Sequence, residues 1–411
     1  MQTSFPKNRI KVVLLEGVHE AGAKMLEAEG FNVESSGKAL EGKALAKAVG
    51  GAHVLGIRSK TNIPADVLAA CPRLLTVGCF CIGTNQVDVD AARGSGIPVF
   101  NSPFSNTRSV AELTIAEIVA LNRHMFDKSA KAHAGEWDKS AEGAHEVRGR
   151  TLGIVGYGRI GSQVSILAEA LGMRVVFHDV AARLALGNAR SVRNLGELLE
   201  QSDVVTLHVP ATKQTEGMIS RAQLARMKKG ALLINNARGS VVDIAALAAA
   251  LKEGHLAGAA LDVFPEEPAG KGDRFSSPVQ GLGNVILTPH VGGSTEEAQE
   301  AISLDVAHKL IKFINNGSTT GAVNVPEVEL PEQHGRKGRT HRILHFHRNV
   351  PGVLSKMHGL IAELGVNIVG EYLQTSRDVG YVVLDIEPHA ADPIVKGLKS
   401  IPETIRVRVL W

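Results

Sequence analysis

Short apolar runs alternate with helical patterns over the first 290 residues of the chain. Apolar runs lie at 11–17, 53–58, 74–83 and 97–103, and an amphipathic stretch at 19–30 follows the first of them. A short apolar run with polar ends is typical of a buried strand, and strands that alternate with helices usually pair in parallel. The pattern therefore predicts a parallel sheet covered by helices.

A second series of the same kind follows a long predicted helix. That helix is expected to begin near Thr107 or Ser109 and to end near Phe126, and the polar segment at 129–150 is expected to cross the surface. The strands predicted after it lie at 151–156, 174–179, 203–210, 231–239, 257–264 and 284–293. Ligands bind at the carboxyl edge of an open parallel sheet, so we expect the chemistry of the protein at that edge.

The last part of the chain has a different order of elements. A long amphipathic helix is predicted at 294–318, and a segment rich in Pro, Gly and basic residues predicts a linker at 331–340. From His341 the pattern predicts strand, helix, strand, strand, helix, strand, which is typical of a ferredoxin-like unit. The predicted fold class is α/β, with two Rossmann-like doubly wound parallel sheets and a C-terminal ferredoxin-like βαββαβ domain.

The composition is that of a globular protein of two or three domains. The chain has 411 residues, 44% of them hydrophobic and 21% charged, and a net charge of +3 that does not indicate nucleic acid as a partner. The amino terminus lacks the apolar run of a signal peptide, and no uncharged apolar run approaches the ~18 residues of a membrane span. We expect a cytoplasmic protein without a membrane partner.

Three cysteines, Cys71, Cys79 and Cys81, are too few to indicate a disulfide framework. A Cys-x-Cys pair such as Cys79 and Cys81 is able to ligate a metal, but no second Cys or His pair at a zinc-like spacing accompanies it. Buried free thiols in a reducing compartment are the favoured interpretation, and no metal is expected.

The sequence Gly-Tyr-Gly-Arg-Ile-Gly, which begins at Gly156, lies between a predicted strand and a predicted helix. Here Gly156 allows a tight turn, Gly158 lets a pyrophosphate approach the backbone, and Gly161 lets helix and strand pack closely. Asp179 ends the next strand, where a carboxylate accepts the ribose hydroxyls of NAD and repels the 2′-phosphate of NADP. The alternative is a structural turn with a surface aspartate, and Arg183 is compatible with some use of NADP.

Three further residues, Arg238, Glu267 and His290, each follow a predicted strand of the second series. An imidazole, with an unperturbed pKa of ~6.5, is suited to accept a hydroxyl proton. A carboxylate beside it raises its pKa, and a guanidinium binds an α-carboxylate bidentately. Each residue alone is more typical of a structural or solvated group. Together, at strand ends of one nucleotide-binding sheet, they favour a site that moves a hydride and a proton.

At these residues the chain resembles the family of D-isomer-specific 2-hydroxyacid dehydrogenases. The resemblance runs essentially end to end and rests on the segments GYGRIG, VVTLHVP, LLINNARGSVVD, LAGAALDVFPEEP and LTPHVGGST. It implies that Arg238 orients the substrate carboxylate, that Glu267 supports His290, and that His290 is the acid/base. The implied cofactor is NAD, and the implied cofactor contacts are Gly156, Gly158, Arg159, Ile160, Gly161, Asp179, His208, Val209, Pro210, Asn236, Ala237, Arg238, Asp262, His290, Val291, Gly292 and Gly293.

The family fold also implies a discontinuous substrate domain. Residues 1–105 and 295–330 would form that domain, and the NAD-binding Rossmann domain of residues 106–294 would be inserted into it. The linker at 331–340 would then lead to a regulatory domain at 341–411. The pattern of apolar positions alone does not exclude two consecutive domains.

Within the family the resemblance is to a short bacterial branch that oxidises 3-phospho-D-glycerate to 3-phosphohydroxypyruvate, the first step of L-serine biosynthesis. A phosphorylated substrate needs cations, and Arg58 and Ser59, at a strand end of the first domain, supply charge and a hydroxyl. Asn106 and Arg108 match the substrate loop of the family, and Lys139 is similar to a lysine that reaches a neighbouring subunit's site. Each of these residues also has an ordinary interpretation as solvated surface.

The C-terminal unit resembles an ACT domain, a small amino-acid sensor, because an Asn-x-Pro-Gly loop follows its first strand. The resemblance implies an L-serine effector site at His347, Asn349 and, across a dimer of domains, Asn367. Val350 stands where a relative has arginine, and the linker holds extra basic residues, so both departures bear on the strength of serine control. The alternative is a domain that only dimerises.

The expected protein is therefore an NAD-dependent dehydrogenase that is inhibited by L-serine and, by resemblance, a homotetramer. The resemblance also implies reduction of 2-oxoglutarate to 2-hydroxyglutarate as a side activity. Two alternatives stay open. One is another D-2-hydroxyacid dehydrogenase, acting on glyoxylate or hydroxypyruvate, and the other is a non-catalytic NADH-sensing scaffold.

Overall fold

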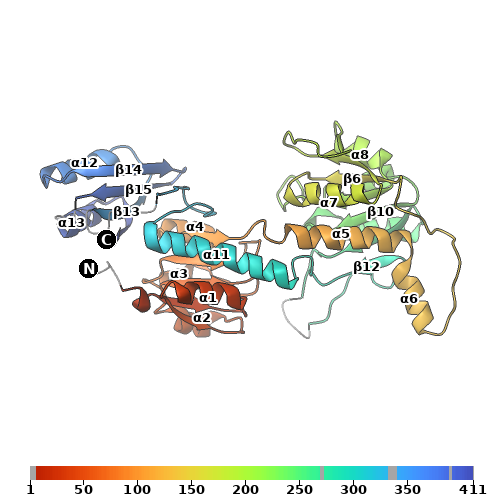
Figure 1. Ribbon diagram of the computed structural model, residues 1–411, viewed down its shortest axis with the longest axis horizontal. Coiled ribbons are helices and arrows are strands. Elements are labelled where there is room, and N and C mark those ends of the chain that lie inside the picture. Colours follow the sequence, from red (N-terminus) through yellow and green to blue (C-terminus); the bar gives the residue numbers. More distant parts are fainter. Residues whose placement is uncertain (1–5, 269–272, 332–339, 388–390, 411) are drawn as a thin grey trace. The chain divides into compact units, whose positions relative to one another are not determined.

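The computed structural model of the chain describes residues 6–268, 273–331, 340–387 and 391–410. The chain divides into two compact units, one of Met1–Ser105 with Glu300–Trp411 and one of Asn106–Gln299. The predicted linker at 331–340 lies, apart from its first and last residues, outside the described ranges. Each unit is built around its own sheet or sheets (Figure 1).

The first unit begins with a parallel sheet in the order β2-β1-β3-β4-β5. Side chains of its strands alternate between two cores: Val13 and Leu55 pack with one set of helices, and Val12 and Val54 with the other. The elements are η1 (Lys7–Arg9), β1 (Lys11–Leu14), α1 (Glu20–Ala28), β2 (Asn32–Ser35), α2 (Gly42–Val49), β3 (Val54–Ile57), α3 (Ala65–Ala69), β4 (Thr76–Cys79), α4 (Val89–Gly94), β5 (Val99–Asn101) and, later in the chain, α11 (Glu296–Asn316).

A second parallel sheet forms the other unit, in the order β12-β11-β10-β9-β6-β7-β8. Helices α5 and α7 lie side by side over one face (Figure 1), and α8, α9 and α10 cover the other. The elements are α5 (Thr107–Asn122), α6 (Met125–His133), β6 (Thr151–Val155), α7 (Arg159–Ala170), β7 (Arg174–His178), β8 (Arg190–Ser191), α8 (Leu195–Gln201), β9 (Val204–Leu207), α9 (Arg221–Arg226), β10 (Ala231–Asn235), η2 (Gly239–Val241), α10 (Ile244–Lys252), β11 (Leu256–Leu261) and β12 (Val285–Leu287).

The strand order of this second sheet reverses between β6 and β9. Chain order runs outward from β6 through β7 to β8 on one side and through β9 to β12 on the other. The carboxyl ends of the two strands at such a reversal are where doubly wound folds bind nucleotides. The predicted class of two Rossmann-like sheets is confirmed, and the topology marks the place for the cofactor.

The long helix predicted from Thr107 to Phe126 is two helices. Helix α5 ends at Asn122, whose side-chain amide donates to the carbonyl of Ile118 at 2.8 Å, and His124 takes a positive φ of 49°. Helix α6 then starts at Met125 and includes the beginning of the stretch that was expected to cross the surface. A left-handed residue cannot continue a helix, which accounts for the break.

The C-terminal part of the first unit is a four-stranded antiparallel sheet in the order β14-β15-β13-β16. Its elements are β13 (His341–Arg348), α12 (Val353–Glu363), β14 (Ile368–Thr375), β15 (Val379–Ile386), α13 (Ala391–Ser400) and β16 (Thr404–Leu410). The order βαββαβ and the pairing confirm the predicted ferredoxin-like arrangement. Helices α12 and α13 cover one face of this sheet (Figure 1).

The other face of the C-terminal sheet joins the core of the first sheet. Leu344, Phe346 and Tyr381 belong to the same buried cluster as Phe313 and Ile314 of helix α11. The hydroxyl of Tyr381 donates to the carbonyl of Gly317 at 2.6 Å. A buried ion pair of Arg342 and Asp385, with N–O distances of 2.7 and 2.8 Å, lies at the end of the same region. The two sheets therefore share one apolar core.

Candidate active site

The glycine turn joins β6 to helix α7 at the point where the strand order reverses. A Cβ on Gly156, which has a φ of 91°, would lie 2.4 Å from the carbonyl oxygen of His208, and one on Gly161 would lie 2.2 Å from that of Gly156. Both positions therefore require glycine. A Cβ on Gly158, the residue before α7, would meet no atom within 4 Å. That open space beside a helix N-terminus fits the pyrophosphate of NAD.

Asp179 lies against the glycine turn. Its carboxylate accepts hydrogen bonds from the backbone N–H groups of Tyr157 and Ala181, both at 2.8 Å, and its side chain is 9% exposed. Nε of Arg183 lies 3.3 Å from the same carboxylate. A fixed carboxylate at the end of the second strand is the group that recognises the ribose hydroxyls of NAD.

His290 and Glu267 come together at the carboxyl edge of this sheet. Nδ1 of His290 lies 2.8 Å from Oε2 of Glu267, and the other carboxylate oxygen accepts the N–H of Phe264 at 3.1 Å. The hydrogen bond that His290 donates to Glu267 raises the pKa of His290, although burial opposes this. Burial disfavours the charge of Glu267, yet the hydrogen bonds from His290 and Phe264 keep the pKa of that carboxyl below its usual value. Because Nδ1 is engaged, Nε2 is left to face a substrate.

Asp262 holds the backbone that carries His290. Its carboxylate accepts the hydroxyl of Thr288 at 2.6 Å and the N–H groups of Val291 and Gly292 at 2.8 and 2.7 Å. The carbonyl of Asp262 accepts the N–H of His290 at 2.8 Å, and His290 has a left-handed φ of 55°. A non-glycine residue in that conformation costs about 1–3 kcal/mol, and the hydrogen bonds to Asp262 hold it there.

Arg238 follows β10 and is half-buried. The side chain of Asn235 bridges the turn, accepting the N–H of Ala237 at 3.1 Å and donating to the carbonyl of Arg238 at 3.0 Å. The positive charge of Arg238 lowers the pKa of Glu267 and also opposes protonation of His290. These interactions place the guanidinium near His290 and Glu267, and its role in substrate binding stays a prediction.

A buried carboxylate that sequence reasoning missed lies behind this edge. Glu117 of helix α5 is 3% exposed and accepts a hydrogen bond of 2.6 Å from the side chain of Asn236. Burial raises the pKa of Glu117 to about 7, against the effect of this hydrogen bond and with help from the charge of Asp262. In the sequence Glu117 lies in the apolar stretch TIAEIVAL, but Glu112 has similarly apolar neighbours, so the sequence does not single out Glu117.

The remaining predicted cofactor residues surround the glycine turn and the His290 loop. His208 follows β9, its Nε2 lies 3.0 Å from Oγ1 of Thr206, and burial lowers its pKa to about 3, so its imidazole is neutral. Val209 and Pro210 continue the same loop, and Arg159 and Ile160 begin helix α7. Gly293 approaches Asn106, since a Cβ there would lie 2.9 Å from the side-chain amide of Asn106.

The predicted substrate residues occupy both units. Arg58 and Ser59 follow β3, and the carboxylate of Glu16 holds their loop by accepting the N–H groups of Arg58, Lys60 and Thr61 at 3.2, 2.9 and 2.8 Å. In the other unit, Asn106 precedes α5, Nε of Arg108 lies 2.5 Å from Glu112, and Lys139 is exposed. Their role in substrate binding stays a prediction.

The predicted effector residues do not meet within one chain. His347 is 2% exposed, donates from Nδ1 to the carbonyl of Arg348 at 2.8 Å, and pairs in register with Gly380. Asn349 follows it and donates to the carbonyl of Ser376 at 2.8 Å. Asn367 precedes β14 at the other end of the sheet, where Ile368 is level with Ile386. A site that uses all three requires a second copy of the domain.

The described residues include no candidate metal site and no candidate membrane-spanning helix. Cys71 and Cys79 are buried and Cys81 is partly buried, all three are free, and burial raises the pKa of the Cys81 thiol to about 11. In the described part of the chain, no group of three His, Cys, Asp or Glu side chains is arranged to hold a metal ion. Over the same residues, no helix combines the length and apolar character that crossing a bilayer requires.

Known proteins resemble the chain over its whole length and in both kinds of sheet. Residues 115–292 match the NAD-binding domain of the D-isomer specific 2-hydroxyacid dehydrogenases, and residues 343–406 match an AHAS small subunit-like ACT domain. The D-3-phosphoglycerate dehydrogenase of Haemophilus influenzae is 53% identical over 411 residues, which cover all of this chain and 99% of that protein. That of Escherichia coli K12 is 52% identical over the full length of both chains.

A solved structure with bound ligands has the same architecture. The D-lactate dehydrogenase of Aquifex aeolicus, in complex with NAD and lactic acid, is 29% identical and superposes with a TM-score of 0.68. The match covers 77% of this chain and all of that one.

Proposed function

The chain belongs to the D-isomer specific 2-hydroxyacid dehydrogenases, among the D-3-phosphoglycerate dehydrogenases, and we propose that it oxidises 3-phospho-D-glycerate to 3-phosphohydroxypyruvate with NAD as its cofactor. One observation carries the proposal: a relative of this name matches every part of the chain at 53% identity. The hydrogen-bonded pair of His290 and Glu267 is suited to the proton transfer that this oxidation requires.

His290 is the base in this proposal. Its Nε2 takes the proton of the substrate's C2 hydroxyl while the hydride leaves the same carbon, so the alcohol becomes a ketone. Bound NAD supplies the hydride acceptor. Glu267 stabilises the imidazolium that forms, through the 2.8 Å contact at Nδ1. Arg238 binds the substrate carboxylate and polarises the oxygen that loses its proton.

The second unit holds the cofactor in this account. The glycine turn at Gly156, Gly158 and Gly161 accommodates the pyrophosphate, and Asp179 accepts the ribose hydroxyls. Residues 106–294 are then the NAD-binding domain, and 1–105 with 295–330 the substrate domain. The open space at Gly158 and the buried position of Asp179 support this assignment.

Specificity for a phosphorylated acid is proposed to come from cations outside the catalytic group. Arg58 and Ser59 would bind the phosphate, together with Asn106 and Arg108, and Lys139 would reach the site of a neighbouring subunit. A second carboxylate in the same place would allow reduction of 2-oxoglutarate to 2-hydroxyglutarate. Initial-rate assays with that acid and NADH test the side activity.

The C-terminal domain is proposed to bind L-serine at His347, Asn349 and Asn367, and serine binding is proposed to inhibit the enzyme. The enzyme is proposed to be a cytoplasmic homotetramer. The match to an ACT domain supports the sensor, and the separation of His347 from Asn367 within one chain supports a site between two copies. Initial rates with and without L-serine, at a known oligomeric state, test this part of the proposal.

Replacement of the proposed base separates an enzyme from an NADH-sensing scaffold. His290→Asn is expected to lower kcat by at least about 100-fold, because general base catalysis contributes a factor of about 10²–10⁴. NADH affinity, followed by fluorescence, is expected to change little, since Asp262 still fixes the loop. Wild-type turnover in this variant would exclude His290 as the base.

A further inference from the structure

A cavity of about 520 Å³ lies in the first unit, at the amino ends of its strands. Arg9 precedes β1, His53 precedes β3, and Arg73 and Leu75 precede β4. Arg58 follows β3, at the opposite, carboxyl edge of the same sheet. The cavity is therefore separate from the proposed substrate residues of this unit.

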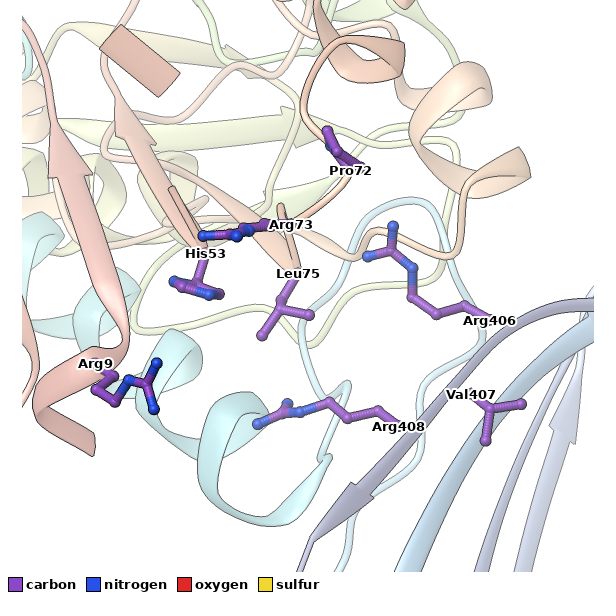
Figure 2. A pocket seen from close by; sticks show the side chains of 8 residues that line it. All are labelled: Arg9, His53, Pro72, Arg73, Leu75, Arg406, Val407 and Arg408. Atoms are coloured by element: carbon purple, nitrogen blue, oxygen red, sulfur yellow. The ribbon is translucent and has the colours of Figure 1, made fainter. Parts of the chain in front are cut away.

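The edge strand of the C-terminal sheet closes the cavity. Arg406 and Arg408 of β16 extend toward His53 and Arg73, whereas Val407 between them faces the other way (Figure 2). This alternation is expected of a strand, and Val407 packs against the core beneath helices α12 and α13. The cavity thus joins the first sheet to the C-terminal domain.

The lining is strongly basic. Of the eight described residues that line it, four are arginines, one is a histidine and three are apolar, so none of these eight carries a negative charge. Two carboxylates of the adjoining elements, Glu34 of β2 and Glu403 before β16, are engaged with other cations, Lys11 and Lys356, both at 2.8 Å. Among the described residues, the cavity lining itself supplies no compensating negative charge.

The cations of the cavity act on one another. Burial lowers the pKa of His53, and the charges of Arg73 and Arg408 lower it further. Burial also lowers the pKa of Arg408 to about 10, and Arg406 adds to that effect. Like charges that are held together and partly desolvated are a cost to the fold. An anion in the cavity would remove that cost.

Two of the guanidinium groups are fixed in place. Arg408 donates to the carbonyls of Phe313 and Ile314, at the end of helix α11, at 3.3 and 2.5 Å. Arg406 donates to the carbonyl of Leu74 at 2.5 Å. A guanidinium has five N–H donors, so each keeps further donors for a ligand. Groups held in position bind an anion with little loss of conformational entropy.

We propose that this cavity is a binding site for a small phosphorylated anion, with Arg73, Arg406 and Arg408 as its principal ligands. Arginine forks match the oxygen geometry of a phosphoryl group, and several of them together favour a multivalent anion. The volume lies within the roughly 300–1,000 Å³ that is usual for sites of small molecules. The ligand links the first sheet to the C-terminal domain, because both contribute arginines.

Calorimetric titration of the full-length protein, saturated with NADH, tests the site with inorganic phosphate and inorganic pyrophosphate at constant ionic strength. Pyrophosphate is expected to bind more tightly than phosphate because it carries more charge. Arg73→Gln is the informative variant, since Arg73 is exposed and makes no ion pair with a described residue. It is expected to weaken pyrophosphate binding about tenfold, the loss typical of one charge-assisted contact. Arg73→Lys, which keeps the charge, should lose less.

Lys43→Gln is the matched control, because it removes one exposed positive charge from helix α2 outside the cavity. It is expected to leave pyrophosphate affinity unchanged. A phosphorylated metabolite rather than the free ion is identified if ATP displaces pyrophosphate and Arg73→Gln weakens ATP as well. The proposal is overturned if neither probe binds the wild type, if Arg73→Gln binds like the wild type, or if Lys43→Gln weakens binding equally.

Discussion

At the scale of single residues, the proposed mechanism makes the pH dependence of activity depend on the contact between His290 and Glu267. Oxidation needs a neutral His290, so kcat/KM is expected to rise with pH through the pKa of this imidazole. Glu267 raises that pKa. Glu267→Gln should therefore move the acidic limb of the pH profile to lower pH and reduce kcat by about 10–100-fold. Glu266→Gln, its exposed neighbour, is the control. An acidic limb at the wild-type position in Glu267→Gln would contradict the pairing.

Glu117 predicts a different pH dependence, one of stability. Its pKa is about 7 in the folded protein against 4.5 for the free group, so its charge is disfavoured by folding. Below pH 4.5 the group is protonated in both states, and its contribution to the free energy of unfolding is fully present. As the pH rises to about 7 that contribution is lost, and the free energy of unfolding falls by up to about 3 kcal/mol. Glu117→Gln should remove this loss.

The measurement is the difference between the unfolding midpoints of Glu117→Gln and of the wild type from about pH 5 to about pH 8, a range that spans the titration of Glu117. The difference should move in favour of the variant as the pH rises. Glu112→Gln, on the exposed side of the same helix, should follow the wild type. Parallel curves for Glu117→Gln and the wild type would show that Glu117 ionises normally.

These residues also show how far sequence reasoning extends at this scale. The proximity of Arg238, Glu267 and His290 was predictable because each follows a strand, and strand ends of a parallel sheet converge. Glu117 was not, because Glu112 and Glu117 look alike in the sequence of helix α5. Only the packing of that helix exposes the first and buries the second.

At the scale of elements, two glycines of the turn between β6 and α7 have different roles. Gly161 is required by the fold, and Gly158 is proposed to be required by the cofactor. A Cβ at position 161 would overlap a backbone carbonyl, whereas one at 158 meets open space. Gly161→Ala should lower both the melting temperature and NADH affinity. Gly158→Ala should keep the melting temperature and weaken NADH binding by about tenfold, because the methyl group takes the room of the pyrophosphate.

Thermal unfolding and a fluorescence titration with NADH, made on both variants, are the measurements. Normal NADH affinity in Gly158→Ala would place the pyrophosphate elsewhere. An unchanged melting temperature in Gly161→Ala would mean that the helix shifts to accommodate the methyl group without cost.

Most elements were predictable from the chain, and the failures have physical causes. Most apolar runs became strands within about four residues of the predicted limits, because buried parallel strands need apolar side chains on both faces. The exception is the run at 284–293, of which only Val285–Leu287 is a strand. Strands β2 and β8 were missed because an edge strand buries little, and the residues of β8 are both exposed. The break between α5 and α6 depends on the left-handed φ of His124, which the sequence does not predict.

At the scale of the whole molecule, the order of the two α/β domains and the ferredoxin-like domain was predictable. The packing of the ferredoxin-like sheet on the first sheet was not. Every residue of β15 is buried, so both faces of that strand are covered. The sequence does not indicate what covers each face. One face meets helices α12 and α13, and the other joins the core of the first sheet around Phe313. Through this shared core and the basic cavity, the C-terminal domain is physically joined to the first sheet.

The proposed substrate is a phosphorylated acid, and a comparison of two acids tests this proposal. Initial rates should be measured with NAD and either 3-phospho-D-glycerate or D-glycerate, which differ only in the phosphoryl group. We expect kcat/KM to be at least about 100-fold higher for the phosphorylated acid, the value of two charge-assisted contacts. Equal or better turnover of D-glycerate would contradict it, and would assign the chain to another D-2-hydroxy acid.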